Sequence, residues 1–160
     1  MDVLNTRVQF EETIKGSRFL SELITCSSQS QARDLIKEQK QKYADSTHVV
    51  HAFITGQAAE VLGMSDDGEP SGTAGAPMLN ILKKNELINV LVIVTRYFGG
   101  TLLGTGGLVR AYSEASLKAI EESGIAIQKF GYEMEITIEY KELEKFKYYC
   151  KKHSINISEI

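Results

Sequence analysis

Ile88-Asn89-Val90-Leu91-Val92-Ile93-Val94 is a nearly continuous apolar run, and it leads through Thr95-Arg96-Tyr97-Phe98 into Gly99-Gly100-Thr101-Leu102-Leu103-Gly104-Thr105-Gly106-Gly107. A strand that is apolar at successive positions is typically covered on both faces. We therefore predict that residues 88–94 form the central strand of a sheet. Leu108, Ala111, Tyr112, Ala115 and Ala119 follow at helical spacing, which predicts a long helix that Gly124 can end.

The segments before this stretch alternate between strand and helix patterns. Residues 8–14 and 18–25 are apolar segments separated at Gly16, which indicates a β-hairpin. Ser28 or Ser30 can cap a helix whose apolar stripe ends at Tyr43. Residues 47–55 and 59–64 are expected to form an antiparallel pair, and Pro77 suits the first turn of a short helix. The pattern predicts an α+β fold.

The last part of the chain has its own pattern. Apolar residues alternate with glutamates and a threonine from Tyr132 to Tyr140, as in a half-exposed strand. A helix with Leu143, Phe146 and Cys150 on one side and a strand over Ile155–Ile160 would complete a β-α-β tail. We therefore expect two domains, residues 1–128 and 129–160.

Composition narrows the class of protein. The chain has 160 residues, 42% hydrophobic and 24% charged, with a net charge of −3. Its apolar runs are shorter than the roughly 20 residues that cross a bilayer, and its first residues do not look like an export signal. Cys26 and Cys150 lie far apart without a zinc-binding pattern. We expect a soluble, cytoplasmic protein without membrane, metal or cofactor, in which any nucleic-acid contact is local.

Residues 65–75, the acidic loop, carry Asp66, Asp67 and Glu69 among three glycines. Grouped carboxylates can bind a hard cation or a basic partner. The alternative is that they form turn hydrogen bonds to backbone N–H groups, with Gly68 at positive φ. His48 and His51 do not form a metal pair, because on a strand they would point to opposite faces.

Residues 96–107, the glycine-rich loop, join the central strand to the long helix, with Arg96 and Arg110 flanking the glycines. Backbone N–H groups and a helix N-terminus beside arginines suit phosphate or carboxylate recognition. The alternative is close packing, with Tyr97 and Phe98 in the core. Thr105 stands where a P-loop has lysine, and Val109 replaces the last glycine of a dinucleotide-binding motif, which disfavours an ATP or NAD enzyme.

Together these two loops carry a resemblance. Residues 66–75, 94–100 and 103–112, with the Lys15-Gly16-Ser17-Arg18-Phe19 segment, resemble the signatures of the IMPACT/YigZ-like family over about residues 1–128. The resemblance implies a two-layer sandwich with the fold of ribosomal protein S5 domain 2, followed here by a partial ferredoxin-like β-α-β tail. Because half of such a unit exposes strand edges, our hypothesis is that two tails pair between chains in a homodimer. The resemblance also implies a role near translation and stress, because eukaryotic relatives regulate translation through protein contacts.

The leading hypothesis is a non-catalytic binding protein that contacts RNA, the ribosome or a translation factor. No catalytic constellation is recognisable among the histidines, serines and cysteines. The runner-up is a metal-dependent hydrolase or phosphotransferase using both loops, and a third class is a protein-interaction module whose acidic loop meets a basic partner. The candidate ligand-binding residues are Lys15, Arg18, Asp66, Asp67, Glu69, Thr73, Arg96, Tyr97, Gly99, Gly100, Gly104 and Arg110.

Overall fold

The predicted central strand, β6 (Val90–Tyr97), lies in the middle of a five-stranded sheet in the computed structural model. Residues 2–3, 7–56, 58–126 and 134–157 are described. The strands follow the order β2-β3-β6-β4-β5, and every neighbouring pair is antiparallel. The other four strands are β2 (Arg7–Ile14), β3 (Ser17–Thr25), β4 (His48–Thr55) and β5 (Val61–Ser65). The predicted hairpin and the antiparallel pair of β4 and β5 are confirmed.

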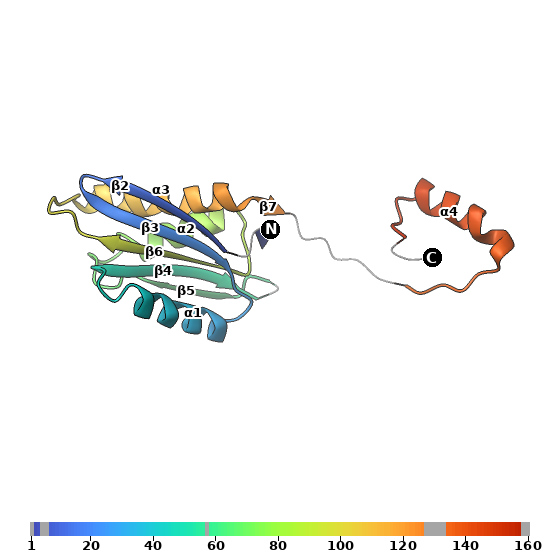
Figure 1. Ribbon diagram of the computed structural model, residues 1–160, viewed down its shortest axis with the longest axis horizontal. Helices are drawn as coiled ribbons and strands as arrows, with labels where there is room; N and C mark the ends of the chain where they lie inside the picture. The colour runs from blue at the N-terminus through green and yellow to red at the C-terminus, as the bar shows by residue number, and fades with distance from the viewer. Residues whose placement is uncertain (1, 4–6, 57, 127–133, 158–160) are drawn as a thin grey trace. The chain divides into compact units, whose positions relative to one another are not determined.

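Helices cover both faces of this sheet (Figure 1). α2 (Gly75–Lys84) and α3 (Thr105–Ser123) lie on one face, and α1 (Gln29–Lys42) lies on the other. The side chains of β6 explain why both faces are covered. Val90, Val92 and Val94 belong to the core under α2 and α3, whereas Leu91 and Ile93 belong to the core under α1. The mixed α/β class is confirmed. The expected two-layer arrangement is wrong, because α1 adds a third layer.

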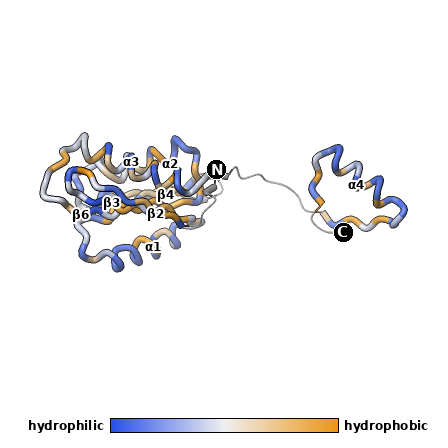
Figure 2. Tube along the Cα trace, turned by 45° about the horizontal axis from the view of Figure 1, so that its top comes forward, coloured by the Kyte–Doolittle hydropathy of each residue, from blue (hydrophilic) through white to orange (hydrophobic). Residues whose placement is uncertain are grey.

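Local signals set the helix ends. Ser28 caps α1, and its side chain accepts a hydrogen bond from the Gln31 backbone N–H at 3.2 Å. Gly124 ends α3 with φ 69°, as its position predicted. Figure 2 shows hydrophobic residues concentrated along the strands and hydrophilic ones spread over the helices. A short two-stranded sheet pairs β1 (Asp2–Val3) with β7 (Ile125–Ala126).

The chain divides into two compact units, Met1–Gln128 and Lys129–Ile160. Within residues 134–157 of the second unit, the structure has a 3₁₀ turn, η1 (Tyr140–Glu142), and the helix α4 (Leu143–Lys152), which buries Cys150. The helix was expected, but residues 134–139 and 155–157 form no strand. The predicted β-α-β tail is therefore wrong in these residues. The rest of both predicted strands lies outside the described residues.

Across the described residues, no helix combines the length and apolar character needed to cross a membrane.

Candidate functional site

The acidic loop and the glycine-rich loop meet at one cavity of about 490 Å³. Gly68, Glu69 and Pro70 line it from the acidic loop, and residues 102–105 line it from the glycine-rich loop. Arg96 at the end of β6 also contributes. Two segments that are separate in sequence thus form one site.

A buried charge network lies beside this cavity. Arg96 Nη1 donates to Glu69 Oε1 at 2.6 Å, and the Tyr112 hydroxyl donates to the same oxygen at 2.6 Å. Arg96 Nη2 also donates to Ser17 Oγ at 3.2 Å. Arg96 is only 4% exposed and Glu69 only 8%. Burial and the bond to Glu69 raise the pKa of Tyr112, so the phenol stays protonated and remains a donor.

Arg96 is therefore held inside the protein rather than presented to solvent. Its guanidinium lies 5.5 Å from the ring centre of Phe19 and 5.7 Å from that of Phe98. Contacts with aromatic rings and paired hydrogen bonds are what a guanidinium favours in a buried position. Its Nε is buried without a hydrogen-bond partner among the described residues. A phosphate would have to displace Glu69 to reach Arg96.

Asp66 supports the acidic loop itself. Its carboxylate accepts backbone N–H groups of Gly72 at 2.8 Å, Ala74 at 3.1 Å and Gly75 at 2.8 Å. Burial opposes its ionisation, but these bonds hold the pKa of Asp66 below its ordinary value. Thr73 is also used locally, because its hydroxyl donates to the Pro70 carbonyl at 2.6 Å. The turn-bonding alternative accounts for Asp66.

Asp67 ties the loop to the sheet and to α1. One carboxylate oxygen accepts the Val49 backbone N–H at 2.7 Å, and the other pairs with Lys40. Burial raises the pKa of Asp67, whereas Lys40, the Val49 N–H and His48 lower it, with a net decrease. Asp67 has φ 44°, a left-handed conformation that aspartate tolerates better than most residues.

These separate contacts leave the metal-enzyme alternative without support. Asp66 binds backbone N–H groups, Asp67 pairs with Lys40, and Glu69 pairs with Arg96. Among the described residues, no group of three or more His, Cys, Asp or Glu side chains is arranged to hold a metal ion. The carboxylates that look clustered in sequence have divergent partners.

Three glycines of the glycine-rich loop are needed for two different reasons. A Cβ on Gly99 would lie 1.9 Å from the Gly16 carbonyl carbon, so the loop and the β2–β3 turn touch backbone to backbone. Gly100 and Gly104 instead adopt φ 84° and 74°, and their surroundings are open. Close packing explains Gly99, whereas backbone conformation explains the other two.

The remaining candidate residues lie around the loops on the surface. Arg18 pairs with Glu11 and lies 5.5 Å from the ring centre of Tyr97, whose hydroxyl donates to Asp45 at 3.0 Å. Lys15 is exposed in the β2–β3 turn. Arg110 is exposed on α3, and its Nε lies 3.5 Å from the Gly106 carbonyl oxygen. Lys15 and Arg110 have no carboxylate partner among the described residues.

The amino-acid sequence did not reveal the apolar rim of the cavity. Leu102 is 82% exposed and Phe98 is 46% exposed, so the close-packing alternative is wrong in placing Phe98 in the core. The sequence also did not reveal the roles of Ser17 and Tyr112. A hydroxyl on the apolar stripe of a helix was a usable signal, because a buried tyrosine hydroxyl requires a partner. Ser17 offered only its place in a family-like segment.

Taken together, the fold and site define a small α/β domain whose two loops build an apolar-rimmed surface over a neutralised charge network. The Impact N-terminal domain model matches residues 15–120, which include both loops. The chain belongs to the IMPACT family.

Similar proteins agree with this assignment. IMPACT family member YvyE of Bacillus subtilis is 36% identical over 95% of this chain and 70% of its own length. An IMPACT family member of Haemophilus influenzae is 38% identical over 97% of this chain and 76% of its own. A crystal structure of a hypothetical protein matches with a TM-score of 0.73 and 31% identity, covering 94% of this chain and 74% of that one.

Proposed function

We propose that this protein is a non-catalytic regulator of translation that binds a protein partner, such as a translation factor, through the surface formed by its two loops. The exposed side chains of Phe98 and Leu102 beside the cavity carry this proposal. Neighbouring apolar side chains that are exposed together, especially beside a pocket, can mark a protein-interaction site. Family membership supports the connection to translation, because eukaryotic relatives are expected to act in this way.

A protein partner fits the charges better than RNA or the ribosome. Binding to phosphates is driven by several unpaired cations, each of which releases counterions. Here Arg96 is paired with Glu69 inside the protein, and Arg18 forms an exposed ion pair with Glu11. Lys15 and Arg110 remain, on a chain with a net charge of −3. Two cations and an apolar rim suit a protein surface with a complementary apolar patch and a few acidic residues.

The experiment compares two substitutions of equal charge. Tagged wild type, Leu102→Asp and Thr101→Asp would be used to capture translation factors and ribosomes from lysate, with and without nuclease. Thr101 is exposed on the same loop, so Thr101→Asp adds the charge without removing the apolar side chain.

We expect a translation factor to be captured by wild type and Thr101→Asp but not by Leu102→Asp, with or without nuclease. Capture that nuclease abolishes would replace the protein partner with RNA or the ribosome. Capture of translation components that is unaffected by Leu102→Asp would remove this loop surface from the proposal.

The other expectations from the sequence remain proposals. We propose that residues 1–128 are built on the fold of ribosomal protein S5 domain 2, with α1 added as a third layer, and that residues 129–160 belong to a ferredoxin-like unit whose strands form only when another chain pairs with them. Exposed apolar side chains in the second unit, including Met134 and Tyr140, support pairing with another chain. Light scattering at high concentration tests this homodimer, and a monomer there would argue against it.

A cytoplasmic location and a role in stress are tested by cell fractionation and by growth under amino-acid limitation.

A further inference from the structure

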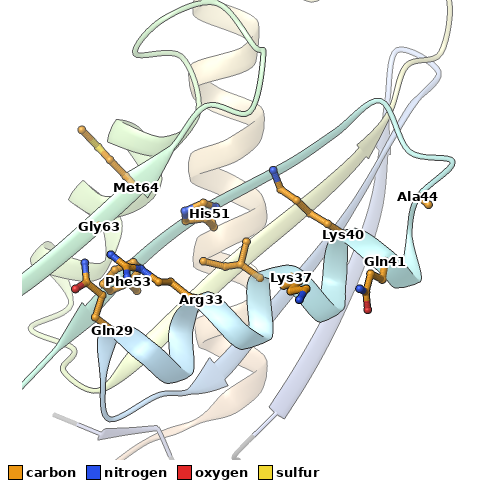
Figure 3. A pocket seen from close by; sticks show the side chains of 11 residues that line it. Gln29, Arg33, Lys37, Lys40, Gln41, Ala44, His51, Phe53, Gly63 and Met64 are labelled. Carbon is orange, nitrogen blue, oxygen red and sulfur yellow. The ribbon is translucent and has the colours of Figure 1, made fainter.

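A second cavity, of about 650 Å³, lies between α1 and the β4–β5 edge of the sheet (Figure 3). It is separate from the candidate site, which is lined by the glycine-rich loop and the first turns of α3. Its base includes Ile36 and Phe53, both of which are nearly buried. The ring of Phe53 occupies the space above Gly63, where a Cβ would meet it at 2.2 Å. The hollow therefore has an apolar base.

The wall of this cavity is positively charged. Arg33, Lys37 and Lys40 line it from α1, and the lining contains no Asp or Glu among the described residues. Lys40 pairs with Asp67, but Arg33 and Lys37 form no ion pair within the described part of the chain. Burial and the nearby Lys40 charge lower the pKa of His51 to about 4, so its ring is neutral at pH 7. The unpaired charge comes from α1.

β5 forms an edge of the sheet beside this wall. It is the last strand of the sheet and pairs with β4 in the described structure. Its residues Val61-Leu62-Gly63-Met64-Ser65 include no charge, although edge strands usually carry charges that discourage further pairing. The opposite edge strand, β2, has such charges at Arg7, Glu11 and Glu12. The two edges are therefore not equivalent.

The register divides β5 between two faces. Gly63 pairs with Phe53 and so lies on the α1 face, whereas Met64 pairs with Ala52, which places its side chain on the opposite face although it also borders the cavity at the sheet edge. Leu62 and Met64 are 44% and 54% exposed on that opposite face. An additional strand would thus meet cations on one face and apolar side chains on the other.

The spacing of the cations on α1 suits an extended ligand. Arg33 and Lys37 are one turn apart on α1, about 6 Å along the helix axis. Alternate side chains of an extended strand are separated by about 6.6–6.8 Å. α1 runs alongside the strands, so a row of carboxylates on an added strand can follow its row of cations (Figure 1).

We propose that the β5 edge binds an extended segment of a partner protein in which acidic and apolar residues alternate. The segment adds as a sixth strand next to β5, with its carboxylates toward Arg33 and Lys37 and its apolar side chains beside Leu62 and Met64. Backbone hydrogen bonds supply affinity, and the alternating side chains supply specificity.

The test uses a fluorescent peptide that alternates Glu and Val, a matched peptide that alternates Lys and Val, and a single-stranded oligouridylate. Each is titrated against the full chain as wild type, Arg33→Glu/Lys37→Glu and Lys83→Glu/Lys84→Glu. Lys83 and Lys84 are exposed in the last turn of α2, so the control makes the same change in net charge away from the cavity.

We expect wild type and the Lys83→Glu/Lys84→Glu control to bind the Glu peptide, with at least about tenfold weaker binding by Arg33→Glu/Lys37→Glu. Amide exchange in residues 61–65 should slow when the peptide is bound. The Lys peptide should not bind. Equal binding of the Glu peptide by all three proteins, no binding at all, or oligouridylate binding that depends on Arg33 and Lys37 in its place would each overturn the proposal.

Discussion

The two loops at the candidate site differ in what their conspicuous residues do. In the acidic loop, Asp66, Asp67 and Glu69 each bind a group inside the protein. In the glycine-rich loop, the glycines allow close packing and unusual backbone conformations, and the side chains left in solvent are Phe98 and Leu102. Charge therefore stabilises this site, and apolar surface is what it offers to a partner.

The largest expected effect breaks the acidic loop's network. Arg96→Ala should reduce the free energy of unfolding by about 3–5 kcal/mol, because Glu69 would remain buried without its partner. Urea denaturation measures this change. Arg18→Ala removes an exposed pair with Glu11 and should cost about 0–1 kcal/mol. A loss of stability in Arg96→Ala as small as that in Arg18→Ala would show that Arg96 is not structural.

A smaller effect separates the two kinds of glycine. Gly99→Ala should cost about 2 kcal/mol, because its Cβ meets the Gly16 backbone and the two turns must move apart. Gly106→Ala has open space in the first turn of α3 and should be neutral or stabilising by up to about 1 kcal/mol. Thermal melts of the two variants make the comparison. Similar melting temperatures would contradict the backbone contact.

The next effect tests Asp66 through pH. Asp66→Asn should cost about 1–2 kcal/mol at pH 7, because three N–H groups lose a charged acceptor. The folded pKa of Asp66 lies below its ordinary value of 3.8. Its contribution is therefore present above that value and lost as the pH falls through the folded pKa. Denaturation from pH 7 to 3 should show the difference from wild type shrinking only at the acidic end.

The smallest effect on stability is expected in the glycine-rich loop. Leu102→Asp should change the free energy of unfolding by no more than about 0.5 kcal/mol, because the side chain is already 82% exposed. Urea denaturation checks this value. A loss comparable to that of Arg96→Ala would mean that Leu102 packs in solution, and the two loops would then not differ as described.

Much of the first unit follows from local patterns. The continuous apolar run of β6 requires cover on both faces, and α1 supplies the cover that the family resemblance did not include. The alternation over residues 132–140 predicted a strand, yet residues 134–139 have none. Alternation describes a surface that suits a sheet, and a strand forms only where a neighbour pairs with it.

The site was only partly predictable for a related reason. Glycine, proline and acid composition located both loops, because local backbone requirements leave a local signal. The partners of the charged residues depend on tertiary contacts, since Arg96 joins Glu69 and Ser17 across the fold. Composition marks where charges are concentrated and does not tell whether they face inward or outward.

The Arg96 network also bears on how long the folded state persists. It joins Ser17 to Arg96 and Glu69 to Tyr112, pairs separated by 79 and 43 positions in the chain. Contacts between distant segments form late when loop closure is costly. Interactions absent from the folding transition state mainly slow unfolding. We therefore expect Arg96→Ala to accelerate unfolding in stopped-flow measurements while leaving the refolding rate nearly unchanged, so that this network governs the lifetime of the native protein.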